Sequence, residues 1–424
     1  MPAVRATPYL GALVYAAIVC AAWLAIPHPV VGVAAAVVPL GAVVALRAPV
    51  LMATLFIAFS FFRLHEVAPF LGPFKLPLLL ALAALAALVF AAAFGKIKPT
   101  WEPLFTPFLC FFGLVTIGVT LASNIDNSVG YWKDTYVKIA IMVFAIAWLV
   151  RSAKHFGFIR TAILLSGCVV SAAALYNKAN GIDLVEGTRV SIGRSIGSVL
   201  GDPNDLALVL LFPAGFALST AFGRGLPALQ RIFAGSVFLL LAFAIIATQS
   251  RGGLLGIVSV SAVIAWARVQ NKALLLGAGA VALAALVSVA GISDRQSGGA
   301  HEEGIDESAQ GRLVAWGAAW RMAVAKPLNG VGLDNFYYNY YLYTDFWDGK
   351  NHAVHSTWFG VMGETGFLGF GVFCWMTISA FQSVNRSYRI QTTTPNRDPV
   401  MVSTAEGLRS ALTGFCVSGT FLTQ

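Results

Sequence analysis

The sequence predicts an all-α polytopic membrane protein, and three of its properties support this fold class. Of its 424 residues, 58% are hydrophobic and 11% are charged, whereas soluble domains have about 45–50% apolar and about 25% charged residues. Long apolar runs recur along the whole chain, and the basic residues gather between them. Because a water-soluble core cannot account for so much apolar sequence, the chain is expected to lie in a lipid bilayer.

The apolar runs predict about 12 to 13 transmembrane helices, because a helix needs about 20 mostly apolar residues to cross the hydrocarbon of a bilayer. The runs at 49–62, 137–150 and 252–267 are short, which leaves the exact number open. All thirteen candidates lie near residues 8–26, 29–46, 49–62, 77–94, 104–122, 137–150, 159–175, 205–222, 231–248, 252–267, 273–291, 356–380 and 402–423.

Basic residues indicate how the chain is oriented, since short loops rich in Lys and Arg are the cytoplasmic ones. With the N-terminus inside, this rule places the segment 292–355 outside, as a periplasmic helical cap. The net charge of +9 is then a result of topology, and no nucleic-acid partner is expected. The residues that follow the rule are Arg5, Arg47, Lys96, Lys98, Arg151, Lys154, Arg160, Arg224, Arg231, Arg268, Lys272, Arg386, Arg389 and Arg397.

The spans and loops divide the chain into four parts. Residues 1–175 form a transmembrane scaffold of seven spans, and residues 176–291 form a transmembrane half whose outer loops carry arginines. Residues 292–355 form the periplasmic cap, and residues 356–424 form the C-terminal transmembrane helices. The first span follows Arg5 without a small-residue cleavage motif, so it is interpreted as a signal-anchor helix.

Aromatic and basic residues in the outer loops have a simple explanation. Residues 63–66 with Lys75, and residues 131–133, are interpreted as anchors at the level of the lipid headgroups, where such side chains gather. The aromatic run 336–341 fits either an anchor of this kind or a surface on which carbohydrate stacks. The scaffold is therefore assigned no chemistry.

The predicted cap has a polar beginning and a helical middle. Residues 293–304 are too polar and glycine-rich to pack, so they are expected to form a mobile loop. Residues 309–325 predict a helix, with Arg312, Trp316 and Trp320 on one face at successive i, i+4 positions.

Arginines at or near the outer membrane surface form the strongest candidate site: Arg189, Arg194, Arg251 and Arg312. Arg251 lies between two apolar runs with almost no loop, so its charge needs either to snorkel to the headgroups or to find a partner. Guanidinium groups bind phosphate oxygens with two prongs and stay charged, so several of them suit a lipid-linked pyrophosphate. Simple snorkelling is the alternative, most of all for Arg189. The glycines after Arg251 are expected to let a headgroup approach the backbone.

Two histidines, His352 and His355, precede the span at 356–380. A histidine at the mouth of a span can act as a general base near neutral pH, although a lone histidine is more often structural. Glu364 lies nine residues after His355, half a turn out of phase at about 100° per residue, so it is not expected to orient that ring. The five cysteines lie within or beside apolar runs, and no disulfide framework, metal site or cofactor is expected.

Five short motifs follow one another between residues 190 and 380. They are Gly201-Asp202-Pro203-Asn204-Asp205-Leu206-Ala207, Ser250-Arg251-Gly252, Gly311-Arg312 with Trp316 and Trp320, Pro327-Leu328-Asn329-Gly330-Val331-Gly332-Leu333-Asp334-Asn335-Phe336, and His355-Ser356 followed by Glu364-Thr365-Gly366-Phe367-Leu368-Gly369. Their order, with a large outer loop between spans, resembles the O-antigen ligase and polymerase superfamily. The first seven spans are similar to that superfamily only in hydropathy.

The resemblance implies a glycosyltransferase of the bacterial inner membrane whose site faces the periplasm. Ligase members transfer a glycan from undecaprenyl pyrophosphate to a lipid A-core sugar, and the transfer expected here is inverting and independent of metal. By that likeness Arg251 and Arg312 fall on the essential arginines of the family and His355 on its essential histidine. Ser356 stands where the family usually has Asn, which leaves the branch open. Donor-binding residues are expected to be Arg189, Arg194, Arg251, Arg312, Trp316 and Trp320.

Other functions remain open at this stage. An O-antigen polymerase or a protein O-oligosaccharyltransferase would use the same arginines and histidine, and the sequence does not separate them by acceptor. A secondary transporter would place ionisable or broken helices at mid-membrane in two related halves. Because the charges here avoid the span centres and no second half repeats the first, transport is the weaker alternative.

Overall fold

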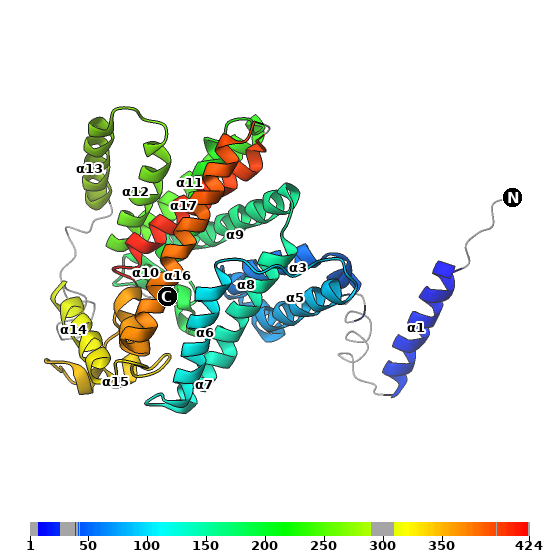
Figure 1. The fold of residues 1–424 in the computed structure, drawn as a ribbon, viewed down its shortest axis with the longest axis horizontal. Coiled ribbons are helices and arrows are strands. Elements are labelled where there is room, and N and C mark those ends of the chain that lie inside the picture. The colour runs from blue at the N-terminus through cyan, green and yellow to red at the C-terminus, as the bar shows by residue number, and fades with distance from the viewer. Residues whose placement is uncertain are drawn as a thin grey trace.

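The described part of the protein is almost entirely helical, as the computed structural model in Figure 1 shows. It comprises residues 7–25, 39, 41, 43–289, 309–395 and 397–422. The sheet in this part is a ribbon of two short antiparallel strands, in which Leu184 pairs with Val190 and Val185 with Arg189. The predicted mobile loop at 293–304 and most of the apolar run at 29–46 lie outside the described residues.

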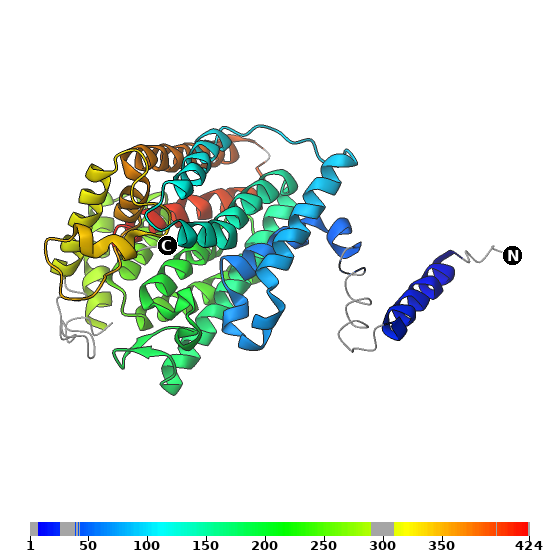
Figure 2. The ribbon, with the colours of Figure 1, turned by 90° about the horizontal axis from the view of Figure 1, so that it is seen from below.

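The elements of the scaffold are α1 (Thr7–Ala25), α3 (Pro49–Ser60), α4 (Leu64–Val67), the 3-10 helix η1 (Pro69–Phe74), α5 (Leu76–Ala93), α6 (Phe105–Thr120), α7 (Ile125–Tyr131), the π-helix η2 (Trp132–Tyr136), α8 (Val137–Leu149) and α9 (Ala153–Asn180). The later elements are β1 (Leu184–Val185), β2 (Arg189–Val190), η3 (Arg194–Ile196), η4 (Val199–Gly201), α10 (Pro203–Ala221), α11 (Ala228–Ala247), α12 (Arg251–Trp266), α13 (Lys272–Val289), α14 (Ala309–Ala325), α15 (Phe336–Tyr343), α16 (Thr357–Thr393) and α17 (Pro399–Ser418). In Figures 1 and 2, α1 stands apart from the other helices.

Five of the described helices are long and apolar enough to cross a membrane, namely α5, α9, α10, α11 and α16. This confirms the all-α membrane class but does not support an exact count of 12 to 13 spans. Several predicted runs form shorter helices, such as α3 with 12 residues and α8 with 13. At 1.5 Å per residue α3 extends about 18 Å, less than the roughly 30 Å of hydrocarbon.

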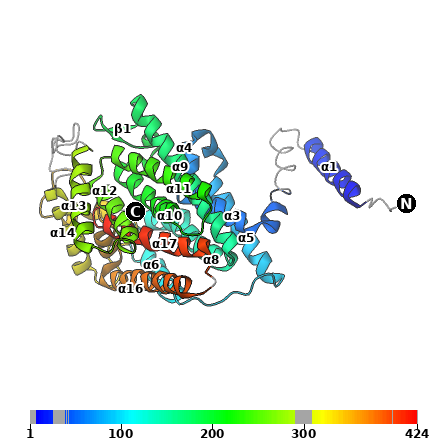
Figure 3. The same cartoon turned by 90° about the horizontal axis from the view of Figure 1, so that it is seen from above.

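α10 is the central helix of the bundle, and almost all of its side chains are buried. It packs against α9, α11, α12 and α17, which surround it in Figure 3. A second apolar core joins α3, α5 and α8, and a third joins α14 and α15 with Val331 and Val354. The predicted helix at 309–325 is α14, and its bounds agree with the prediction.

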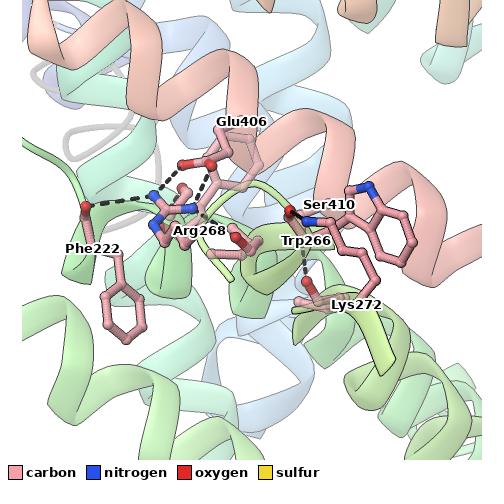
Figure 4. A network of polar contacts seen from close by, with 10 residues as sticks. Phe222, Trp266, Arg268, Lys272, Glu406 and Ser410 are labelled. Atoms are coloured by element: carbon pink, nitrogen blue, oxygen red, sulfur yellow. Dashed lines mark hydrogen bonds and ion pairs between the residues drawn. The ribbon is translucent and has the colours of Figure 1, made fainter. Parts of the chain in front are cut away.

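The end of α12 away from Arg251 is fixed by an ion pair, shown in Figure 4. The Arg268 guanidinium donates through Nη1 to Glu406 Oε1 at 2.6 Å and through Nη2 to Oε2 at 2.8 Å. The hydrogen bond from Arg268 to Glu406 raises the pKa of Arg268, and burial opposes it. Arg268 lies beside Phe222 at the end of α10. The pair therefore fastens α12 and α10 to α17.

α14 and α16 interlock at a break in α16. Gly366 has φ 69° and ψ −175° inside that helix, a conformation that is essentially restricted to glycine. The amide of Leu368, beyond the break, donates to the carbonyl of Pro327 at 3.2 Å, and Val331 donates to Gly363 at 3.0 Å. The segment after α14 thus replaces backbone partners that the break removes from α16.

Alanine at Gly366 is expected to destabilise the protein by at least about 3 kcal/mol, because it adds a steric clash to a disfavoured backbone conformation. A Cβ there would lie 2.5 Å from the Pro327 carbonyl oxygen. Gly371→Ala is the control in the same helix, since a Cβ at Gly371 meets no atom within 4 Å. Thermal unfolding of the purified protein in detergent measures both. Equal unfolding temperatures for the two variants would contradict the interlock.

Candidate active site

Three helices begin at short motifs that were identified in the sequence. The Asp202 carboxylate caps α10 by accepting from the Asn204 amide at 2.6 Å, and the Ser250 hydroxyl caps α12 by accepting from Gly253 at 3.2 Å. Arg251 is the first residue of α12. His355 directly precedes Ser356, the N-cap of α16. Helix N-termini carry partial positive charge, so all three helix starts favour an anion.

Ser356, which stands where the resemblance would place Asn, caps the N-terminus of α16. Its hydroxyl accepts a hydrogen bond from the Phe359 amide at 3.4 Å, and the side chain is fully buried. Serine and asparagine are both among the preferred N-cap residues. Ser356 therefore supplies a helix cap that Asn could also supply at this position.

The turn after α17 brings the starts of α12 and α16 together. The Thr357 amide donates to the carbonyls of Gly419 and Leu422, each at 2.8 Å. A Cβ on Gly252 would lie 2.9 Å from Leu422 Cγ. Leu422 therefore contacts both the residue after Arg251 and the second residue after His355. Sequence reasoning missed this turn, because it is apolar and carries no reactive group.

Arg189 is buried and connects the strand ribbon to two of these helix starts. Its Nε donates to the carbonyl of Thr248 at 3.2 Å, and its Nη2 donates to Asn204 Oδ1 at 2.9 Å. Glu186 lies 3.6 Å from its Nη1. Since Thr248 precedes the cap of α12 and Asn204 lies in the first turn of α10, Arg189 connects the starts of these two helices.

Arg194 lies on an exposed turn that packs against the start of α10. Gly193 and Gly197 flank η3 with φ of 69° and 68°, and the Gly193 amide donates to Asp183 Oδ2 at 2.7 Å. A Cβ on Gly201 would lie 2.9 Å from Arg194 Cα. The glycine that opens the Gly201-Asp202-Pro203 motif thus allows the Arg194 turn to lie against it.

His355 is half-buried and has φ 46°, a left-handed conformation that is uncommon for residues other than glycine. Burial lowers the pKa of its imidazole, Asp202 raises it, and Arg312 and Arg189 lower it. These residues lie within electrostatic reach of the ring. The structure therefore places the predicted histidine near two of the predicted arginines and near Asp202, which sequence reasoning had not assigned.

Trp316 holds the loop that carries His355. Its indole Nε1 donates to the carbonyl of Val354 at 3.1 Å, and its ring stacks on Phe359 with 4.9 Å between centroids. Trp320 lies one turn further along α14, is 52% exposed, and packs edge-on against Phe367. Both tryptophans of the predicted face therefore contact α16, and Trp320 is the more exposed of the two.

Arg251 is exposed, and in the described ranges its side chain makes no hydrogen bond or ion pair. The expectation that the next glycines admit a headgroup is wrong. Gly252 and Gly253 are buried, and a Cβ on Gly253 would lie 2.6 Å from Ala207 Cβ. These glycines allow α12 to pack closely against α10 and Leu422, and only the arginine side chain faces outward.

Glu364 and His352 both make contacts in the loops around the site, and His352 also lies within electrostatic reach of His355. The Glu364 carboxylate accepts from the amides of Asp334 at 3.0 Å and Phe336 at 3.1 Å, so it fixes the turn before α15. His352 Nε2 lies 3.0 Å from Asp348 Oδ2, and its ring packs edge-on against Tyr340. Both residues therefore shape the loops around the site.

The described residues contain no cluster of three His, Cys, Asp or Glu side chains that could hold a metal ion. The five cysteines are free.

Comparison with protein families gives a match within the second half of the chain. Residues 236–374 match the family model described as O-antigen ligase, and this region includes Arg251, Arg312 and His355 but not Arg189 or Arg194. The comparison with curated proteins gives no match. The resemblance predicted from the five motifs is confirmed, and the chain carries, across residues 236–374, a domain of the O-antigen ligase and polymerase superfamily.

Proposed function

We propose that the protein is an O-antigen ligase that transfers a glycan from undecaprenyl pyrophosphate to a sugar hydroxyl of the lipid A core. The observation that carries this proposal is that Leu422 contacts the starts of both α12, which begins at Arg251, and α16, which follows His355, with Arg312 within electrostatic reach of the histidine. Cations, helix N-termini and a neutral base together suit the departure of a pyrophosphate and the attack of a hydroxyl.

In the proposed reaction, Arg251, Arg312 and Arg194 hold the pyrophosphate of the donor. The bond between the anomeric carbon and the phosphate oxygen breaks, and the guanidinium groups stabilise the charge that grows on the leaving group. The acceptor oxygen forms the new bond from the opposite face, which inverts the anomeric centre. His355 takes the hydroxyl proton, and undecaprenyl pyrophosphate leaves.

The electrostatics at His355 suit a base. Because burial and two arginines lower its pKa below the ordinary value, the imidazole is neutral and able to accept a proton at pH 7. The Asp202 carboxylate stabilises the imidazolium that forms in the reaction. Trp316 positions the ring through the Val354 carbonyl, and Arg189 positions the starts of α10 and α12.

Deletion of the gene in its native host tests the function and separates it from its relatives. Loss of a ligase leaves long polymer on the lipid carrier and lipopolysaccharide without O-antigen. Loss of a polymerase instead leaves single repeats, and loss of a protein O-oligosaccharyltransferase leaves lipopolysaccharide intact. Analysis of lipopolysaccharide and of lipid-linked glycans from the same cells reads all three outcomes.

The site is proposed to face the periplasm from the bacterial inner membrane. Lys350, in the loop before α16, and Lys154, at the start of α9, are both exposed and test this topology. With the five native cysteines replaced, an impermeant thiol reagent is expected to label Lys350→Cys in cells with a permeabilised outer membrane. Lys154→Cys is expected to react only after the inner membrane is opened. The reverse pattern would reject the proposed orientation.

A further inference from the structure

Arg63, in the scaffold half, adjoins the turn that carries Arg194. Arg63 Nη1 donates to Glu66 Oε1 at 2.6 Å, and the Ser198 hydroxyl donates to Glu66 Oε2 at 2.5 Å. The Glu66 side chain is 13% exposed. One carboxylate therefore joins α4 to the segment that begins at η3, although these parts are separated by more than 120 residues of sequence.

The described part of the protein satisfies only part of the hydrogen-bonding capacity of the Arg63 guanidinium. Arg63 has φ 50°, and its side chain is 31% exposed. Within the described ranges its hydrogen bond to protein uses Nη1 alone, so Nε and Nη2 point to no other protein acceptor. The left-handed backbone at Arg63 and the fixed Glu66 hold the guanidinium at the edge of α4.

Electrostatic contacts connect Arg63 with the proposed donor site. Asp205, in the first turn of α10, lies within electrostatic reach of both Arg63 and Asp202, and Asp202 lies within reach of His355. On the scaffold side, burial raises the pKa of Tyr131 to about 12, and Arg63 opposes that rise. Arg63 thus lies within electrostatic reach of both Tyr131 and the start of α10.

We propose that Arg63 is a further phosphate-binding residue of the donor site, and that Glu66 is a positioning residue that fixes it beside the Arg194 turn. The ligand class is a polyprenyl pyrophosphate. The inference rests on the proposed function and extends it, because it makes the scaffold half one wall of the donor site. Two arginines from different halves would then hold one pyrophosphate, with α12 contributing Arg251.

Binding of farnesyl pyrophosphate to the purified full chain in nanodiscs tests this inference, with farnesol as the probe without phosphate. Arg63→Asn removes the charge and keeps a residue that tolerates the left-handed conformation. It is expected to weaken farnesyl pyrophosphate binding about 10-fold or more, because charged hydrogen bonds are lost, and to leave farnesol binding unchanged. Lys75→Asn is the matched control, since Lys75 is an exposed cation with φ 46° in the same outer loop.

Two further variants separate ligand contact from folding. Arg63→Asn/Glu66→Gln leaves no unpaired carboxylate, so it is expected to unfold at the temperature of the parent protein and still bind weakly. Ser198→Ala releases Glu66 from the Arg194 turn and is expected to weaken pyrophosphate binding a few-fold, with no change for farnesol. Unchanged pyrophosphate binding in Ser198→Ala would remove the positioning role of Glu66.

Two outcomes separate failure of the Arg63 inference from failure of the proposed function. If Arg63→Asn binds farnesyl pyrophosphate as well as Lys75→Asn does while Arg251→Ala binds it weakly, Arg63 is an interfacial anchor and the inference fails alone. If Arg251→Ala also binds as well as the parent protein, the donor site itself is misplaced and both proposals fail.

Discussion

Replacement of His355 by alanine is expected to lower the rate of glycan transfer at least ~10²-fold, the usual contribution of a general base. Binding of the lipid-linked donor should persist, because the arginines remain. His355→Asn should lose as much activity, and it keeps a residue that tolerates the left-handed backbone at this position. Transfer is measured with purified donor and acceptor in a reconstituted system.

His352→Ala is the control for this experiment, because His352 pairs with Asp348 and shapes the loop. It should keep most of the activity. An active His355→Ala enzyme, or equal losses for the two histidines, would reject the proposed base.

The pH dependence of the transfer rate is expected to depend on the charged groups around the His355 imidazole. A base must be neutral, and the pKa of His355 is lowered by burial and by Arg312 and Arg189 while Asp202 raises it. The rate should therefore fall on the acid side only below the ordinary histidine pKa of about 6.5. Asp202→Asn keeps a good N-cap and removes the opposing charge, so it should move this fall to still lower pH. An acid limb at the same pH as in the parent protein would show that Asp202 does not act on His355.

Arg251→Ala is expected to reduce transfer by about 10²–10³-fold, as loss of a group that stabilises developing charge does. Arg251→Lys should be almost as inactive, because a point charge does not reproduce the two-pronged contact of guanidinium with phosphate. Arg231→Ala is a suitable control, since Arg231 is an exposed arginine of α11 near the other end of α10. Near-normal transfer by a well-folded Arg251→Lys protein would make Arg251 a surface anchor.

Addition of EDTA tests whether transfer needs a divalent metal ion. Arginines are proposed to neutralise the pyrophosphate in place of Mg²⁺ or Mn²⁺. The rate in the reconstituted assay should not change. Loss of activity that Mg²⁺ restores would reject the arginine clamp.

Prediction from sequence succeeded where a local pattern determines the structure. Residues 309–325, which lie before Pro327, predicted the helix α14, and the order of short motifs predicted the family domain. The number of transmembrane helices was harder to predict, because apolar content does not determine whether a run forms one helix long enough to cross the membrane. α16 is the opposite case, since its helix continues to Thr393, well beyond the predicted end of its apolar run at residue 380.

The site was only partly predictable, because its geometry depends on contacts between distant segments. The sequence selected His355 and the arginines by their chemistry, but it could not indicate that Arg189 is buried against Thr248 and Asn204. Nor could it assign Glu364, whose carboxylate caps amides 28 to 30 residues away. A signal for Asp202 was available, since it precedes Pro203 at a helix start, a position that often exposes a carboxylate near an N-terminus.

The hydrogen bonds of Thr357 to residues 419 and 422, and those of Ser123 to Val331, join segments that are synthesised at different times. The segments that these bonds join leave the ribosome far apart in time, since Ser123 and Val331 are 208 residues apart. Early helices can insert and pair while the start of α16 still lacks its partners. The start of α16 therefore reaches its final arrangement only after residues 419 to 422 have been synthesised, and the proposed transfer should begin only then.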